Sequence, residues 1–436
     1  MLTVNAPGHP VRKAPVVHYG WVIVGASFLV LMNYGIFYSY GVFFKPLIAE
    51  FGWSRAETSL AFSFYLVTYS TTGIIMGWLS DRHGPRLPVF LAALLIGGGL
   101  AALSRVSSLW TLYLFFGLVA ALGHGASWIV PVSTVVRWFE RRRGMAMGIV
   151  TAGMGVGTLL FPFLANYLIA SLGWRQAFLV VGVVVFCYNV LAALLLRRGP
   201  TSMGLAVYGV GEGDVPVGDD PALYPGYTLR EAVVTYAFWS VYACVTLGFA
   251  SYALLLVHLV PYATDQGIDP AGAVGVVALF GVGALLGRTV LGTVSDHIGR
   301  RGTLRLSYVI NALAISGLMV GLNLQLLFII AFAVGFFGIG GSVVLGPLFG
   351  EIFGQLHLGK ILGAFMTCGA AAGFVGPYMA GYLYDLTGDY SAAFLGAAGI
   401  ATMAAILAFL IPLSARQGGS GLSGPCSRAG VYPRRR

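Results

Sequence analysis

Long runs of apolar residues alternate with short polar segments along the whole chain. Each run holds roughly twenty residues or more, enough for a helix to cross a bilayer core of roughly 30 Å and too many for a barrel strand. The pattern predicts an all-α integral membrane protein with twelve transmembrane helices, over residues 18–43, 56–79, 87–104, 109–136, 144–169, 175–196, 233–260, 271–294, 303–322, 326–350, 360–383 and 389–413.

Composition and charge agree with this class. Of the 436 residues, 58% are hydrophobic and 9% are charged, whereas soluble domains carry about 25% charged residues. The net charge of +10 does not indicate a nucleic-acid partner, because twenty of the 25 Lys and Arg residues fall on one side of the predicted membrane. Basic loops mark the cytosolic side. We therefore expect a multi-pass protein of the cell membrane, surrounded by lipid, with both termini in the cytosol.

Proline and glycine divide the chain into two halves. Residues 197–231 are rich in both and include the acids Glu212, Asp214, Asp219 and Asp220, which predicts a cytosolic linker. It separates an N-terminal six-helix bundle over 18–196 from a C-terminal six-helix bundle over 232–413. We expect a cytosolic segment over 1–17 before the first bundle and a cytosolic tail over 414–436 after the second.

The two halves repeat each other. Residues 77–84, Gly-Trp-Leu-Ser-Asp-Arg-His-Gly, recur 215 positions later as residues 292–299, Gly-Thr-Val-Ser-Asp-His-Ile-Gly. One shared offset across many spans indicates a parallel duplication, with two bundles related by an axis normal to the membrane. The same offset relates Gly144 to Gly359, Gly148 to Gly363, Pro162 to Pro377 and Gly173 to Gly388.

The repeated loop carries a known motif. Residues 77–86, Gly-x-x-x-Asp-Arg-x-Gly-Pro-Arg, resemble the signature of the major facilitator superfamily between spans 2 and 3, and residues 296–301 resemble its second copy between spans 8 and 9. The alternative is that these are solvated loop charges. The two equivalent copies favour a conformational role, in which acids cap helices or pair with arginines to control the closing of the cytosolic face. The predicted gating residues are Asp81, Arg82, Arg86, Asp296 and Arg300.

Three further segments narrow the resemblance. Residues 18–24, His-Tyr-Gly-Trp-Val-Ile-Val, look like the start of bacterial monocarboxylate and oxalate–formate porters, and the block over 138–148 is similar to the start of span 5 in the monocarboxylate porter family. Gly287 and Arg288, followed by Gly292, resemble the span-8 segment that holds that family's substrate-binding arginine. The resemblance implies alternating access with a central site for small carboxylates such as lactate, pyruvate or acetate, often moved with a proton.

The chain also departs from its relatives. Animal members carry a lysine where Tyr38 stands and an aspartate where Ala284 stands, and both groups are tied to proton transfer there, so their absence puts that proton mechanism in doubt. The oxalate porter uses a second cation in span 11, whereas residues 361–383 contain no Lys or Arg. One buried cation suits one carboxylate.

Arg288 is the strongest candidate on physical grounds alone. It lies in the apolar stretch 272–294, which contains no carboxylate, and charged residues inside a membrane usually mark a substrate or ion pathway. A planar guanidinium can hold a carboxylate by two parallel charge-assisted bonds. The alternative, snorkelling to the loop at Asp296, requires a reach of roughly 12 Å along the helix, and the surrounding glycines indicate close packing instead.

Other polar and aromatic residues in the spans are weaker candidates. Tyr34 and Tyr38 share a helical face with Asn33 nearby, so they line the cavity or belong to the interfacial aromatic belt. Phe365 supplies an apolar wall or packs in the core. His124 and His258 titrate near neutral pH and are candidates for the coupling proton, with a neutral interior histidine as the alternative. The sequence places His258 on a stretch broken by a proline and predicts an exposed loop for the acid at 265.

These observations predict a secondary active transporter of small monocarboxylates, coupled to protons, with a carboxylate anion exchanger of the oxalate–formate type as the alternative. The sequence contains no phosphate loop, no metal-ligand or hydrolase motif and no cysteine spacing typical of metal sites. We therefore expect no enzyme activity, no cofactor, no metal and no obligate protein partner. A carboxylate sensor would need a larger soluble output region than the linker and tail provide.

Overall fold

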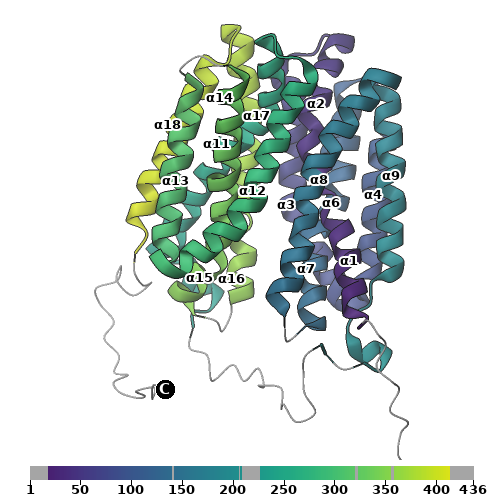
Figure 1. Cartoon of the computed structure of the whole chain (residues 1–436), viewed down its shortest axis with the longest axis vertical. Coiled ribbons are helices and arrows are strands. Elements are labelled where there is room, and N and C mark those ends of the chain that lie inside the picture. Colours follow the sequence, from purple (N-terminus) through teal and green to yellow (C-terminus); the bar gives the residue numbers. More distant parts are fainter. Residues whose placement is uncertain are drawn as a thin grey trace, which may run out of the picture.

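The computed structural model describes residues 18–139, 142–205, 207–208, 226–319, 323–354 and 358–412. Within these ranges the regular structure is helical, apart from two isolated β-bridges. The helices form two groups that stand side by side with their axes roughly parallel (Figure 1). The prediction of an all-α membrane protein is confirmed, because eleven helices are long and apolar enough to cross a membrane. The predicted segment 1–17, most of the linker and the tail over 414–436 lie outside the described residues.

The N-terminal bundle contains the first six predicted spans. Three are single long helices and one is short but continuous, while the first and fourth consist of several segments. In chain order they are α1 (Gly20–Leu31) with α2 (Tyr34–Phe51), α3 (Arg55–His83), α4 (Arg86–Leu103), α5 (Leu109–Leu112) with η1 (Tyr113–Ala120), α6 (Ala121–His124) and α7 (Ala126–Trp138), α8 (Arg143–Leu172) and α9 (Trp174–Leu195).

The C-terminal bundle follows a short 3₁₀ turn, η2 (Pro200–Met203), and a short helix, α10 (Leu229–Val233). Its spans are α11 (Tyr236–Asp265), α12 (Pro270–Ile298), α13 (Arg300–Ser316) with η4 (Gly317–Met319), α14 (Leu324–Ala333) with η5 (Val334–Ile339), η6 (Gly340–Val344) and α15 (Leu345–Phe353), α16 (Leu358–Phe365) with α17 (Cys368–Thr387), and α18 (Ser391–Leu410). The predicted span 303–322 corresponds to α13, which has 17 residues and three arginines near its start.

The repeat in the sequence reappears as a repeat in backbone geometry. Gly84 ends α3 with φ of 85°, and Gly299, its equivalent, ends α12 with φ of 79°. A positive φ costs glycine little and other residues much more, so both copies of the motif stop a helix at the same point. Gly173 and Gly388 likewise share a positive φ.

The structure differs from the predicted spans in detail. Spans 4 and 10 contain π-helical segments, η1 and η5, which no periodicity in the sequence predicted. Span 7 is not broken: α11 runs through Pro261 to Asp265. Proline removes the hydrogen bond to the carbonyl four residues earlier, and that carbonyl, of Val257, faces Gly41 in α2. A Cβ atom at Gly41 would lie 3.0 Å from the Val257 oxygen.

The bundles meet along two pairs of helices, and the repeat relates one pair to the other. α3 packs against α17, and α8 packs against α12, with α2 against α11 between them. We call the side where α1 begins and α18 ends the terminal face, and the opposite side, where α2 and α11 end, the far face (Figure 1). The space between the bundles is the place to look for a substrate site.

Candidate functional site

Arg288 faces the N-terminal bundle from α12. It continues a stripe with Gly281 and Leu285, spaced so that all three lie on one side of the helix. Gly281 and Leu285 contact Thr158 and Gly155 of α8. The Arg288 Nη1 atom lies 2.7 Å from the sulfur of Met154, also in α8. The side chain is therefore directed to the interface between the bundles, half-buried, and no ion pair to it is present among the described residues.

Glycines hold the α12 helix in this position. A Cβ atom at Gly287 would lie 2.1 Å from the Phe336 carbonyl oxygen, and one at Gly283 would lie 2.4 Å from the Phe332 oxygen. These distances show backbone contact between α12 and span 10, which only glycine permits. One side of α12 is thus fixed in the C-terminal bundle, and the side with Arg288 is left for the interface.

Four tyrosines lie within electrostatic range of the Arg288 guanidinium: Tyr34, Tyr38, Tyr69 and Tyr252. Tyr34 and Tyr69 share a hydrogen bond of 2.5 Å between their hydroxyl oxygens. The rings of Tyr38 and Tyr252 flank Phe280 at centroid distances of 5.7 and 6.2 Å. A cation with neutral hydroxyl groups in its electrostatic range suits a small anion with further oxygen atoms. The sequence indicated Tyr34 and Tyr38 but missed the other two, which have no distinguishing spacing.

Asn33 is buried in a hydrogen-bond network inside the N-terminal bundle. Its Nδ2 atom donates to Ser127 Oγ at 3.0 Å and to Asn189 Oδ1 at 3.1 Å. Its Oδ1 atom accepts from the Tyr188 hydroxyl at 2.5 Å and from Asn189 Nδ2 at 2.9 Å. The amide thus ties the junction of α1 and α2 to α7 and α9. Its substrate-binding role stays a prediction.

Phe365 is fully buried at the end of α16. Its ring lies 4.6 Å from that of Phe349 and 6.1 Å from that of Tyr242, all in the C-terminal bundle. This environment agrees with the core-packing alternative, and its place as an apolar wall of the site remains a prediction.

His124 lies in an aromatic enclosure beside the tyrosine pair. The rings of Tyr34, Tyr69 and Tyr65 surround it at centroid distances of 4.8, 5.0 and 5.7 Å. Neither ring nitrogen has a hydrogen-bond partner among the described residues. The enclosure disfavours a positive charge on this ring while it is closed, because burying an unpaired charge is costly.

The predicted gating residues sit at the terminal face, each bonded within its own bundle. Asp81 binds Arg137 at 2.5 Å, and Asp296 binds Arg300 at 2.6 Å. Arg82 lies over the ring of Trp78, with Cζ 5.6 Å from its centroid. Arg86 donates to the carbonyls of Leu194 and Leu196 at the end of α9. None of these described contacts joins the two bundles, so their gating role stays a prediction.

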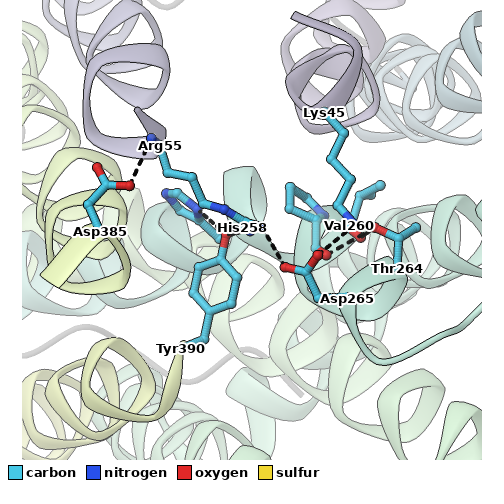
Figure 2. Close-up of polar contacts among 9 residues, drawn as sticks. Lys45, Arg55, His258, Val260, Thr264, Asp265, Asp385 and Tyr390 are labelled. Atoms are coloured by element: carbon cyan, nitrogen blue, oxygen red, sulfur yellow. Dashed lines mark hydrogen bonds and ion pairs between the residues drawn. The ribbon is translucent and has the colours of Figure 1, made fainter. Parts of the chain in front are cut away.

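The far face, by contrast, carries polar contacts between the bundles (Figure 2). The Asp265 carboxylate forms ion pairs with Lys45 Nζ at 2.6 Å and with Arg55 Nη2 at 2.7 Å. Asp265 is exposed, as expected, but it does not lie in a loop, because α11 extends to this residue and brings it against α2 and α3. Asp385 accepts hydrogen bonds from the backbone amides of Arg55 and Ala56, at 3.0 and 2.8 Å, and so caps the start of α3.

His258 adjoins this group of contacts from inside the C-terminal bundle. Its Nε2 atom lies 2.9 Å from the Pro377 carbonyl oxygen, and its Nδ1 atom lies 3.0 Å from the Tyr390 hydroxyl. Arg55 Nη1 donates to the same hydroxyl at 2.6 Å. We call Lys45, Arg55, Asp265, Asp385 and Tyr390 the far-face cluster. The alternative of a hydrogen-bonded interior histidine fits His258 better than His124.

Comparisons with known proteins agree with the fold. The family model described as Major Facilitator Superfamily matches residues 26–344, and again 238–425. Mouse monocarboxylate transporter 11 is 30% identical over 86% of this chain and 84% of its own length, and the human protein of that name is 29% identical over 86% of this chain and 79% of its own. The oxalate:formate antiporter of Oxalobacter formigenes is 29% identical over 81% of this chain and 82% of its own length.

A solved structure supports the same architecture. The crystal structure of a bacterial homolog to the human lysosomal transporter Spinster superposes with a TM-score of 0.73, covering 90% of this chain and 97% of that one at 17% identity. At that identity the likeness concerns the fold alone. The matched family model, the relatives along most of the chain and the two six-helix bundles together establish that the chain is a transporter rather than an enzyme, a member of the major facilitator superfamily and, within it, of the monocarboxylate porter family.

Proposed function

We propose that the chain moves small monocarboxylates, such as lactate, pyruvate or acetate, together with a proton by alternating access. Arg288 binds the substrate carboxylate. The observation that carries this proposal is a half-buried guanidinium that faces the bundle interface and whose described polar partner is a thioether. A neutral sulfur accepts hydrogen bonds weakly and brings no compensating charge, so an anion is the ligand that suits this position.

The surrounding residues support a one-anion site. The guanidinium fork can hold both carboxylate oxygens. The Tyr38 hydroxyl and the remaining hydrogen of the Tyr34–Tyr69 pair are donors for the other polar atoms of the substrate. Once the anion neutralises Arg288, the bundles can close around the site without burying an unpaired charge. His258 and His124 are the candidates for the accompanying proton.

We further propose that the terminal face lies in the cytosol and that the bundle spans the cell membrane. The support is the distribution of basic residues, twenty of which fall on that side of the chain in the predicted topology. The far-face cluster would then lie on the outer side.

The alternative is exchange of one carboxylate for another, as the name of the Oxalobacter relative describes for that protein. It requires a carboxylate on the opposite side of the membrane for every turnover. The absence of a Lys or Arg from α17 speaks against a dicarboxylate substrate, because a second carboxylate would then lack a second cation.

Uptake of radiolabelled lactate, pyruvate, acetate and oxalate into proteoliposomes tests the proposal. We expect uptake of the monoacids to rise when the outside is made acidic and to need no carboxylate inside. Arg288→Gln should abolish it. Arg288→Lys keeps the charge but loses one of two parallel bonds, about 1.5–3 kcal/mol, which corresponds to roughly 10- to 150-fold weaker binding.

Arg105→Gln is the matched control, because Arg105 is exposed in the loop between α4 and α5 and its loss should leave uptake unchanged. Full lactate uptake by Arg288→Gln would refute the assignment of Arg288. Uptake that is indifferent to the pH gradient but dependent on internal carboxylate would replace proton symport with exchange.

A further inference from the structure

A chain of hydrogen bonds runs from the N-terminal bundle to His258. A guanidinium has only donors, so the Tyr390 oxygen accepts from Arg55 Nη1 at 2.6 Å. A carbonyl only accepts, so His258 Nε2 carries a hydrogen and donates it to Pro377 at 2.9 Å. The remaining contact, 3.0 Å between Tyr390 and His258 Nδ1, satisfies both groups when Nδ1 carries no hydrogen. Tyr390 donates its single hydrogen to a bare Nδ1 atom, and His258 is neutral.

A second proton on His258 does not fit this arrangement. It would sit on Nδ1 and point at a hydroxyl that already accepts from Arg55, and the Tyr390 hydrogen would lose its acceptor. His258 is fully buried, so an unsatisfied group there costs roughly 1–3 kcal/mol. The positive charge would also approach that of Arg55. Asp385 is the nearby acid, but its two oxygens accept from the backbone amides of α3, and the two His258 nitrogens contact Tyr390 and Pro377 instead.

The arrangement exists only while the bundles meet at the far face (Figure 2). Arg55 belongs to α3 of the N-terminal bundle, whereas Tyr390, His258 and Asp265 belong to the C-terminal bundle. Phe44 of α2 closes the site further, with its ring 5.3 Å from that of His258. When the bundles separate there, Arg55 leaves Tyr390 and the histidine loses its cover.

From this geometry we infer that closure of the far face excludes a proton from His258 and that protonation of His258 opens the far face. This inference rests on the proposed proton-coupled function and adds the direction of the coupling. The Tyr390 hydroxyl is the positioning group, since it transmits the presence of Arg55 to Nδ1. An acidic solution at the far face then favours the conformation that admits substrate from that side.

The test measures the distance across the far face without substrate. Spin labels are placed at Ser107→Cys, in the N-terminal bundle, and at Ala271→Cys, in the C-terminal bundle, in a chain whose native cysteines are replaced by alanine; both sites are exposed. We expect the longer-distance population of the labelled protein in nanodiscs to grow as the pH falls from 8 to 5. A label pair at Ser107→Cys and Ser171→Cys, both in the N-terminal bundle, is the control and should not change.

Two variants identify the titrating group. His258→Gln keeps a donor for Pro377 and an acceptor for Tyr390 but takes no proton, so its far face should stay closed at every pH. Tyr390→Phe keeps the ring but removes the bond that favours neutral His258 in the closed state, so the midpoint of opening should move to higher pH. If one variant fails to fold, the other still tests whether His258 is the titrating group.

Three results overturn the inference: distances of the unmodified far face that do not change with pH, an unaltered pH response in His258→Gln, or an unaltered midpoint in Tyr390→Phe. A response retained by His258→Gln would assign the titration to a group other than His258. No carboxylate substrate is present in the distance measurement, so these outcomes do not bear on the proposed transport of monocarboxylates. Absence of monocarboxylate uptake would refute that function while leaving the distance results in place.

Discussion

Asp265→Asn tests how much the far-face cluster holds the bundles together. Asp265 binds Lys45 and Arg55 at 2.6 and 2.7 Å, and both partners come from the other bundle. The substitution removes the charge and keeps the volume of the side chain. The Asp265 side chain is 26% exposed, so the lost attraction depends on how far each pair is shielded from water.

The two ion pairs contribute unequally to the free energy that holds the far face closed. The Lys45 side chain is 38% exposed, and exposed pairs contribute roughly 0.2–1 kcal/mol. The Arg55 side chain is 14% exposed, and a charge-assisted hydrogen bond of that kind contributes about 1.5–3 kcal/mol. Together the closed far face loses about 2–4 kcal/mol, which corresponds to a roughly 30-fold to several hundred-fold shift toward the open state.

The assay is the distance between the labels at Ser107→Cys and Ala271→Cys, measured at pH 7.5 in nanodiscs. We expect a second, longer-distance population in Asp265→Asn. Asp389→Asn is the matched control, because Asp389 is an exposed acid of the same face whose carboxylate accepts from the nearby Ser391 amide. A distance distribution for Asp265→Asn that coincides with that of the control would refute the reasoning that these ion pairs hold the face closed.

Three further substitutions test the packing around the site, each followed by thermal unfolding in detergent and by the KM for lactate. Asn33→Ala leaves its buried partners without hydrogen bonds, which costs about 1–3 kcal/mol for each unsatisfied group, so the melting temperature should fall. An increase in KM without that fall would instead establish substrate contact. Phe365→Ala should cost about 3–5 kcal/mol with KM unchanged in the protein that remains folded, and a selective change in KM would contradict the packing role. Gly287→Ala forces a Cβ atom toward the Phe336 oxygen and should cost about 1–3 kcal/mol, whereas Gly25→Ala, with no atom within 4 Å of its Cβ position, should be neutral or stabilising.

The broad architecture could be predicted because local sequence determines it. The length of the apolar runs sets the spans, and the shared offset places Gly84 and Gly299 at equivalent helix ends, where both have a positive φ. The orientation of Arg288 followed from the cost of exposing a guanidinium to lipid, and its contact with Met154 agrees with that argument.

The far-face cluster could not be predicted in the same way. Arg55 and Asp385 are separated by 330 positions and meet only because α3 packs against α17. From the sequence alone, Asp265 is one acid near a turn, and nothing marks the residues that will face it. The network around Asn33 was missed for the same reason, since Ser127 and Asn189 lie 94 and 156 positions away.

The backbone contact between α12 and span 10 has a consequence for the path of the substrate. With no side chain at Gly287 or Gly283 to act as a spacer, α12 cannot rotate against its neighbour without breaking direct contact between main chains. Arg288 is therefore a fixed part of the C-terminal half, and we expect α8 to be the surface that moves relative to it. We expect a bound anion to stay attached to that half throughout the transport cycle, while the N-terminal half moves and exposes the anion to one side of the membrane or the other.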